Sequence, residues 1–262
     1  MIAIPAISRF KAATIHLALS AAIAATTLAV MLTLWYPPPL FQAMGGTELA
    51  ILIIGIDVAI GPLITVIIFD TKKKELLFDL AVIAALQLAA LVYGIYAMHA
   101  GRPVFAVFVE DRFIIVSAAE LEAEAVAKAQ RPEFRTLSLT GPRWVAADMP
   151  TDPQEVRNIL FAGLLGLGAQ NLPQYFAPYG ERSSQILARS RPLDRLAKIS
   201  PQETALIDKA LVRSGRTREQ VRFLPVLTKH AQLMALIDHG SGALIEVVTV
   251  DPSAARLPFK GP

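Results

Sequence analysis

Three long apolar runs near the N-terminus constrain this chain more than any other feature of its sequence. They cover residues 14–36, 49–69 and 76–98, and none of them contains Lys or Arg. Each has the roughly 20 residues that an α-helix needs to cross a hydrocarbon core about 30 Å thick. We therefore expect a membrane region over residues 1–100, with three transmembrane α-helices at these spans.

The composition agrees with a membrane protein. Hydrophobic residues make up 54% of the chain and charged residues 18%, which is more apolar than an ordinary soluble domain. The first run is too long for the apolar part of a secretory signal, and Trp35, Tyr36 and three prolines follow it without a small-residue cleavage site. We interpret it as an uncleaved anchor.

The basic residues beside the spans predict the orientation of the helices. Arg9 and Lys11 precede the first span, Lys72, Lys73 and Lys74 lie between the second and third, and the loop of residues 38–47 has none. Under the positive-inside rule, the N-terminus and the lysine loop lie in the cytoplasm. The domain that follows is then periplasmic, and the protein is a multi-pass protein of a bacterial inner membrane.

Polar residues near the middle of the spans are the first candidate site. At about 1.5 Å per residue, Asp57 in the second span and Gln87 in the third reach a similar depth, together with Thr26 and Thr27 in the first. An ionisable residue at that depth usually faces the bundle or a partner. Asp57 is either a docking or proton-sensing carboxylate, or a protonated acid bonded to Gln87 or a threonine that holds the helices together.

Small residues and one proline mark the second span. Gly61-Pro62 interrupts it beside Asp57, and because proline lacks an N–H, we expect a kink there unless Thr65 or a neighbour compensates. Gly55 and Ala59 are four residues apart and offer a face on which another helix can approach closely.

The pattern after residue 100 predicts a membrane-proximal soluble α+β domain over residues 101–262. Residues 104–109 and 112–116 form an expected hairpin, residues 144–146 a short strand, and residues 221–250 three strands with a turn at 238–242. Capping patterns at Ser117, Asp152 and Ser200 predict helix starts, the first helix extending to about Gln130. We expect an antiparallel sheet with helices packed on it.

No catalytic, cofactor-binding or metal-binding motif is evident, so we expect no enzyme activity and no cofactor. The chain has no Cys, and it lacks the sequence patterns of zinc proteases, α/β-hydrolases and P-loop proteins. The net charge of +3 is too weak to indicate a nucleic-acid partner.

Two features of the soluble domain are candidate contact surfaces. Tyr175, Phe176 and Tyr179 cluster in one segment that is either core or a binding hot spot. Basic side chains are concentrated in two stretches, which indicate either a solvated face or contact with anionic membrane lipids. The first stretch contains Arg182, Arg189, Arg191, Arg195 and Lys198, and the second contains Arg213, Arg216, Arg218 and Arg222.

Several short segments carry a resemblance to a known family. They are Ile15-His16-Leu17, Trp35-Tyr36-Pro37, Gly55-Ile56-Asp57-Val58-Ala59-Ile60-Gly61-Pro62-Leu63, Phe78-Asp79-Leu80, Asp111-Arg112-Phe113 and Leu172-Pro173-Gln174-Tyr175. In this order, and with three spans, the chain resembles the TfpX/TfpZ family of type IV pilin accessory proteins.

That resemblance implies an inner-membrane accessory protein that binds type IV pilin or the inner-membrane pilus assembly proteins and modulates assembly. The family supplies no catalytic residues to carry over. A membrane-anchored periplasmic sensor is the alternative, although the cytoplasmic segments are short, so a partner would have to carry the signal.

Overall fold

The computed structural model describes residues 7–164, 168–196 and 199–252. The chain forms two compact units. The first unit combines the chain up to Trp35 with Gly45–Ala100, and the second combines Tyr36–Met44 with the chain from Gly101 onward.

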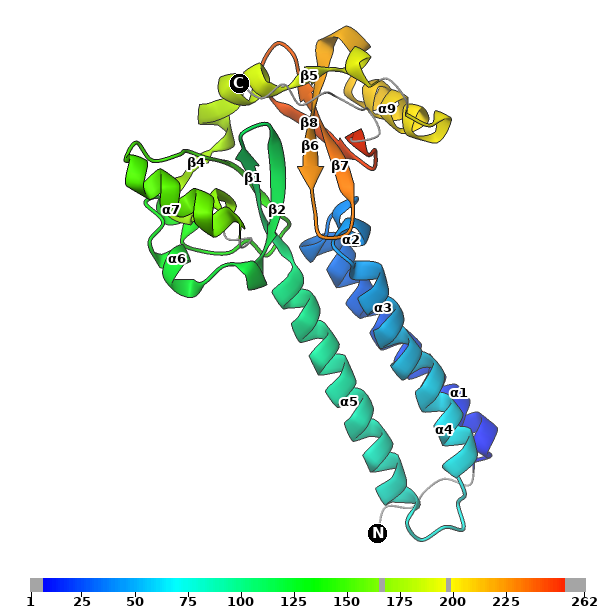
Figure 1. Cartoon of the computed structure of the whole chain (residues 1–262). Coiled ribbons are helices and arrows are strands. Elements are labelled where there is room, and N and C mark those ends of the chain that lie inside the picture. The colour runs from blue at the N-terminus through cyan, green and yellow to red at the C-terminus, as the bar shows by residue number, and fades with distance from the viewer. Residues whose placement is uncertain (1–6, 165–167, 197–198, 253–262) are drawn as a thin grey trace. The chain divides into compact units, whose positions relative to one another are not determined.

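The described part of the first unit contains three membrane-length helices (Figure 1). The first is α1 (Arg9–Val30) with a π-helical turn, Met31–Trp35; the second joins α3 (Gly46–Ile54), a π-helical turn (Gly55–Ile60) and α4 (Gly61–Ile68); the third is α5 (Leu76–Gly101). Their length and hydropathy suffice to cross a membrane. The three predicted apolar helices are therefore confirmed.

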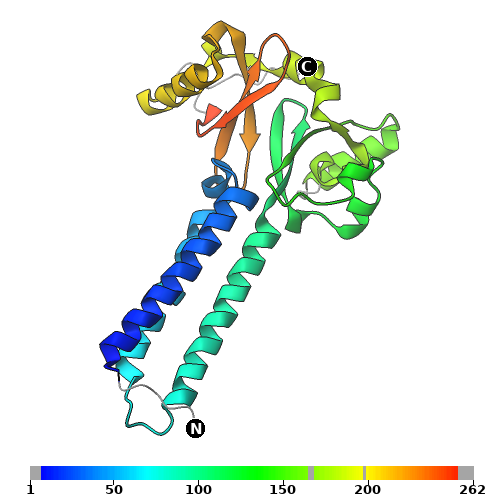
Figure 2. The same cartoon turned by 180° about the vertical axis from the view of Figure 1, so that it is seen from behind.

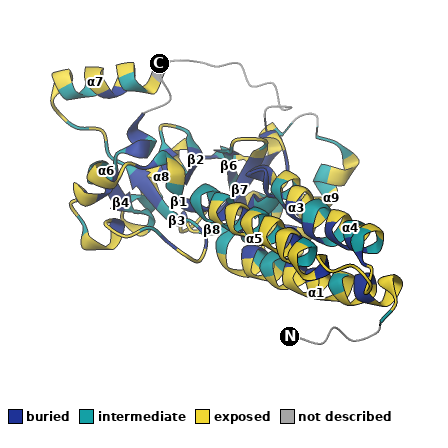
Figure 3. Ribbon diagram, turned by 90° about the horizontal axis from the view of Figure 1, so that it is seen from below, coloured by how far each residue is buried: buried dark blue, intermediate teal, exposed yellow. Residues whose placement is uncertain are grey.

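Few residues of these helices are buried, and exposed (yellow) and intermediate (teal) positions make up most of their ribbons in Figure 3. On α5 the buried residues are Leu76, Ile83, Gly94 and Met98. Because these positions recur at multiples of about 3.6 residues, they form one narrow stripe, and most other side chains of the helix are apolar and not buried. This exposure suits helices whose solvent is lipid.

The second unit is built around one mixed sheet (Figure 2). Its strands are β1 (Pro103–Val109), β2 (Arg112–Ser117), β3 (Arg143–Ala147), β4 (Phe176–Pro178), β5 (Arg191–Pro192), β6 (Val221–Leu227), β7 (Gln232–Asp238) and β8 (Leu244–Val248). In the described residues the order is β4-β3-β1-β2-β6-β7-β8, and β5 pairs with β6.

The prediction of an antiparallel sheet was wrong in part. The expected hairpin of β1 and β2 and the terminal meander of β6, β7 and β8 are antiparallel, but β1 pairs in parallel with β3, and β2 in parallel with β6. Short turns enforce antiparallel neighbours, whereas the long connections that precede β3 and β6 let the chain return in the same direction.

Helices and two apolar clusters complete the second unit. The helices are α2 (Leu40–Ala43), α6 (Ala123–Ala127), α7 (Pro153–Leu164), α8 (Ser183–Arg189) and α9 (Pro201–Ser214). One cluster surrounds Phe105 and Phe176, and the other surrounds Ile207 and Phe223. The capping boxes at Ser117 and Ser200 are present, but the first opens only a 3-10 turn, and α6 is far shorter than the predicted helix.

The loop after the first span belongs to the fold of the second unit. Tyr36 is buried, and this burial raises its pKa to about 12, against the opposing effect of the nearby Arg102 charge. The Thr228 hydroxyl donates to the carbonyl oxygen of Ala43 at 2.6 Å, and the backbone N–H of His230 donates to the same oxygen at 3.2 Å. Residues 36–44 are thus packed rather than free.

Gly141 is the position at which this packing depends on glycine. Its φ is +76°, and a Cβ there would lie 2.9 Å from Cγ of Pro37. We expect Gly141→Ala to lower the free energy of unfolding by about 1–3 kcal/mol, because both the backbone and the contact become strained. Gly180→Ala is the matched control, since its Cβ would meet nothing within 4 Å. Denaturant unfolding of the detergent-solubilised chain measures both, and equal stabilities would contradict the prediction.

Candidate functional site

The candidate site among the three membrane-length helices lies at the π-helical turn of the second one. Pro62 lacks an N–H and so cannot bond back to Val58, which loosens the regular ladder at this level. The Gly61 N–H bonds to the Ile56 carbonyl, five residues back, as in a π-turn. The expected irregularity beside Asp57 is therefore a widened turn, and the Thr65 hydroxyl lies 3.0 Å from the Gly61 carbonyl oxygen.

Gln87 connects this turn to the other two spans. Its Nε2 donates to the backbone carbonyl of Asp57 at 3.1 Å, and its Oε1 lies 2.8 Å from Nε2 of His16. His16 in turn lies 2.7 Å from the Thr65 hydroxyl through Nδ1. One side chain of α5 is thus bonded both to α1 and to the second span.

The donor and acceptor roles follow from the Gln87 amide. Because its nitrogen donates to the Asp57 carbonyl, its oxygen must accept, and Nε2 of His16 therefore carries a proton. Gly61 makes room for this bridge, since a Cβ there would lie 2.1 Å from Nε2 of Gln87. A glycine and a long amide together let polar groups meet inside an apolar bundle.

The Asp57 side chain does not form the bond that the sequence suggested. It is 6% exposed, and its Oδ1 has no hydrogen-bond partner among the described residues. Gln87 bonds to its backbone instead. The turn thus holds a buried carboxyl group with unused hydrogen-bonding capacity, which is the kind of group that needs an explanation in a native structure.

The predicted site residues separate into two groups. Asp57, Gly61 and Pro62 are buried, whereas Ala59 is exposed and Gly55 has nothing within 4 Å of the position of a Cβ. Sequence reasoning missed His16 as a site residue, and it considered Thr65 only as a residue that could compensate for Pro62. Both are polar residues within apolar runs, which is the signal that would have found them; Thr26 instead bonds to the Ala22 carbonyl of its own helix.

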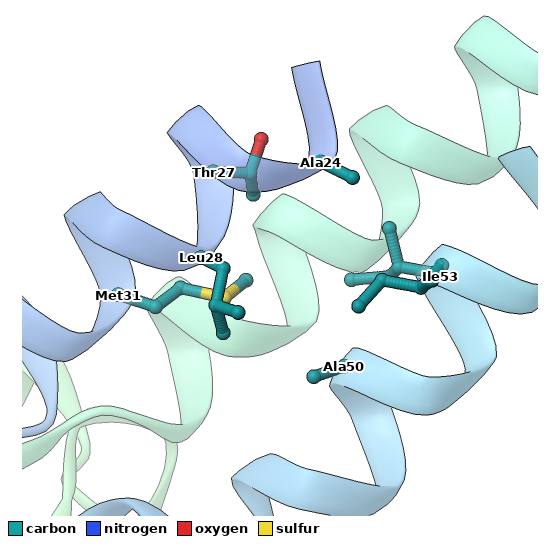
Figure 4. Close-up of a pocket in the computed structure, with 7 residues that line it drawn as sticks. Ala24, Thr27, Leu28, Met31, Ala50 and Ile53 are labelled. Carbon is teal, nitrogen blue, oxygen red and sulfur yellow. The ribbon is translucent and has the colours of Figure 1, made fainter. Parts of the chain in front are cut away.

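A small apolar cavity lies between α1 and α3 (Figure 4). Its volume is about 10 Å³, which is the space of a single water molecule. Its lining is Ala24, Thr27, Leu28, Met31, Ala50, Ile53 and Ile54. A cavity of this size and character cannot hold a cofactor.

The three aromatic residues of the soluble domain are largely internal. Phe176 is buried against Phe105, with ring centroids 5.1 Å apart. The Tyr175 hydroxyl donates to Glu155, and the Tyr179 hydroxyl donates to the carbonyl oxygen of Gly242 at 2.6 Å. These contacts support the core interpretation of the cluster.

Most of the basic side chains in the two predicted stretches form ion pairs within the domain. Arg182 pairs with Asp148, Arg191 with Asp111, Arg213 with Glu246, Arg216 with Asp238 and Arg218 with Asp208. Arg222 bonds to Ser190, and Lys198 lies outside the described residues. In the part of the chain that the structure describes, no group of three or more His, Asp or Glu residues could hold a metal ion.

Comparisons with known proteins assign the chain to a family. A fimbrial assembly protein of Dichelobacter nodosus from serogroups C1 and C2 is 39% identical over 113 residues, which cover 42% of this chain and 86% of that protein. The chain belongs to the fimbrial assembly protein family.

Other matches extend this likeness along the chain. Fimbrial assembly proteins of Dichelobacter nodosus from serogroups I and E1 are 29% and 28% identical over 232 residues, which cover 87% of this chain and 90% of each protein. The model of the family described as fimbrial assembly protein FimB matches residues 5–45. No solved structure matches the chain.

The close approach of α5 to α3 can be tested by a disulfide, because the chain has no native Cys. A Cβ on Gly94 would lie 3.9 Å from Cβ of Ile53, within the range of about 3.5–4.5 Å for a disulfide. We expect Ile53→Cys with Gly94→Cys to crosslink under mild oxidation, and Ile53→Cys with Tyr93→Cys, whose tyrosine is exposed, to remain reduced.

Adding Gly61→Ala to the crosslinking pair tests the Gln87 bridge. We expect a lower disulfide yield because the new methyl group displaces the Gln87 amide, whereas Gly55→Ala should leave the yield unchanged. Mobility on a non-reducing gel measures both. Equal yields would show that the bridge does not position α5.

The alkaline titration of Tyr179 tests the burial of this side chain in the second unit. Burial raises its pKa to about 12, above the unfolded value of about 10. The stability that it contributes is complete below pH 10 and is lost as the pH rises toward 12. We expect Tyr179→Phe to remove one late component from the tyrosinate absorbance of the folded chain; an unchanged late phase would contradict this assignment.

Proposed function

We propose that this chain is a non-enzymatic accessory protein of the bacterial inner membrane that assists type IV pilus biogenesis. The observation that carries the proposal is its likeness to fimbrial assembly proteins over nine-tenths of their length. Three helices suited to a membrane support it. The finer assignment to the TfpX/TfpZ family is part of the proposal and rests on the resemblance of the quoted segments.

The proposed topology follows from the basic residues beside the spans. Residues 1–100 form the membrane region, with the N-terminus and the loop around Lys73 in the cytoplasm. The domain of residues 101–262 then lies in the periplasm. A chain arranged in this way can meet a membrane-anchored pilin or the inner-membrane assembly proteins both within the bilayer and outside it.

The face of the second span at Gly55 and Ala59 is the proposed contact for a partner helix. Ala59 is exposed, and a Cβ on Gly55 would have open space around it. Small residues let helix backbones approach closely in lipid, where packing rather than water exclusion drives association. Asp57 lies between them in sequence and on the buried side of the same turn, so its proposed role is to shape that turn.

The soluble domain is the proposed second contact, either with the pilin head or with periplasmic assembly proteins. Tyr175 and Tyr179 are half-buried, and their hydroxyl groups donate hydrogen bonds within the domain. Their proposed role is therefore to hold the shape of this surface rather than to contact the partner with a free ring. Because most of the basic side chains are ion-paired within the domain, they favour a solvated face rather than a lipid-binding one. Membrane lipids remain a proposed contact of the three helices.

The test is crosslinking and purification from piliated cells. We expect the tagged wild-type chain to recover pilin or inner-membrane pilus components, and Ala59→Leu to reduce that recovery by about tenfold, since added bulk blocks close helix approach. Ala85→Leu, at an exposed alanine of α5, is the matched control and should keep full recovery. Mass spectrometry and surface-pilus counts measure the result.

The same experiment decides the role of Asp57. Asp57→Leu should lower piliation at normal protein level if the buried carboxyl group shapes the contact. Unchanged piliation would remove Asp57 from the functional account, and wild-type bait free of pilus components would overturn the proposal as a whole.

A further inference from the structure

One helix of the second unit, α7, turns an apolar face away from its own domain. The other side of the helix is held, because Ile159 is buried and the Tyr175 hydroxyl donates to the Glu155 carboxylate. Leu160 and Phe161 are instead 55% and 69% exposed. Figure 3 shows α7 at the periphery of the unit, with exposed positions along much of its length. Two large apolar side chains thus lie side by side in contact with solvent.

The sequence around this face is uncharged over an unusual length. No Asp, Glu, Lys, Arg or His occurs between Arg157 and Glu181, and residues 162–168 read Ala-Gly-Leu-Leu-Gly-Leu-Gly. The other long helix of the unit, α9, differs, because it carries Glu203, Asp208, Lys209 and Arg213. Single exposed apolar residues are ordinary, whereas adjoining ones in an uncharged segment indicate a contact with a protein or a membrane.

The connections of the chain favour a membrane as the occupant. The chain passes between the two units after Trp35, after Met44 and after Ala100. Only Arg102 separates α5 from β1. A domain joined so closely to three membrane-length helices stays within reach of the lipid surface that those helices cross. A lipid surface is therefore available to this face at all times, whereas a protein partner has to be recruited.

Arg157 gives the face the chemistry of an interfacial helix. It precedes Leu160 and Phe161 by three and four residues, so it lies on the same side of α7. It bonds to Gln154 of its own helix, and none of the ion pairs among the described residues includes it. Helices that lie in the plane of a membrane place Leu and Phe among the acyl chains and basic side chains at the lipid phosphates.

We propose that the outward face of α7 lies in the headgroup region of the bilayer, with Leu160 and Phe161 among the acyl chains and Arg157 at the lipid phosphates. This contact would fix the orientation of the second unit on the membrane surface. The proposal rests on the proposed membrane insertion of the three helices and does not depend on a role in pilus assembly.

The test places a fluorescent label at one position of the full-length chain, which has no native Cys. Phe161→Cys carries the label on the proposed face. Leu88→Cys, at an exposed residue in the middle of α5, reports the bilayer interior, and Val212→Cys, at an 82% exposed residue of α9, reports a surface away from lipid. Each labelled chain is reconstituted in nanodiscs of phosphatidylcholine and phosphatidylglycerol, with nitroxide-bearing lipids or aqueous iodide as the quencher.

Each position has a distinct expected result. The label at residue 161 should lose most of its fluorescence to a nitroxide near the headgroup and little to iodide, and the label at residue 212 should do the reverse. The label at residue 88 should respond to a nitroxide deep in the acyl chains. Iodide quenching at 161 like that at 212 would overturn the proposal. Protection from both quenchers would also overturn it and would assign the face to a protein contact. Failure at 88 would instead reject the membrane insertion on which the proposal rests.

A charge on the face separates lipid contact from mere proximity. With the label at residue 161, Leu160→Asp should bring the lipid quenching down to the level at residue 212, because a carboxylate resists entry among acyl chains. Leu160 is exposed, so this change should leave the fold intact. Asn158→Asp adds the same charge to an exposed position of α7 away from this face and should keep the quenching. An equal response of the two variants would contradict the assignment of the face.

Discussion

The amide of Gln87 is the interaction on which the arrangement of the membrane-length helices depends. Apolar faces gain little by leaving lipid for one another, so close packing and hydrogen bonds between helices must hold such a bundle. Gln87 bonds to His16 of α1 and to the backbone at Asp57. It can do so because Gly61 has no side chain to exclude it.

The π-helical turn gives the second span two different faces. Asp57 is buried on one side, whereas Gly55 and Ala59 face open space on the other. Pro62 explains the turn, because its missing N–H leaves the ladder free to widen before it. A single irregular turn thus combines an internal polar connection with an open surface for a partner helix, which is how the proposed contact can exist without disturbing the bundle.

The second unit holds many of its polar groups in contacts within itself. Residues 36–44 are packed into it through Tyr36 and the hydrogen bonds to Ala43. The ion pairs of its arginines satisfy charge within the surface. Both features join residues that are far apart in the sequence, so local sequence patterns do not reveal them.

The sequence by itself determined the three apolar helices, the local hairpins and the helix starts at Asp152 and Ser200, because hydropathy, turn residues and caps act between near neighbours in the chain. Only the tertiary structure decided that Gln87 bonds to His16 rather than to the Asp57 carboxyl group, and that β1 and β2 have parallel neighbours. These features bring together residues far apart in sequence. Their pairing depends on side-chain reach and on the space left by residues such as Gly61, and neither is encoded in local periodicity.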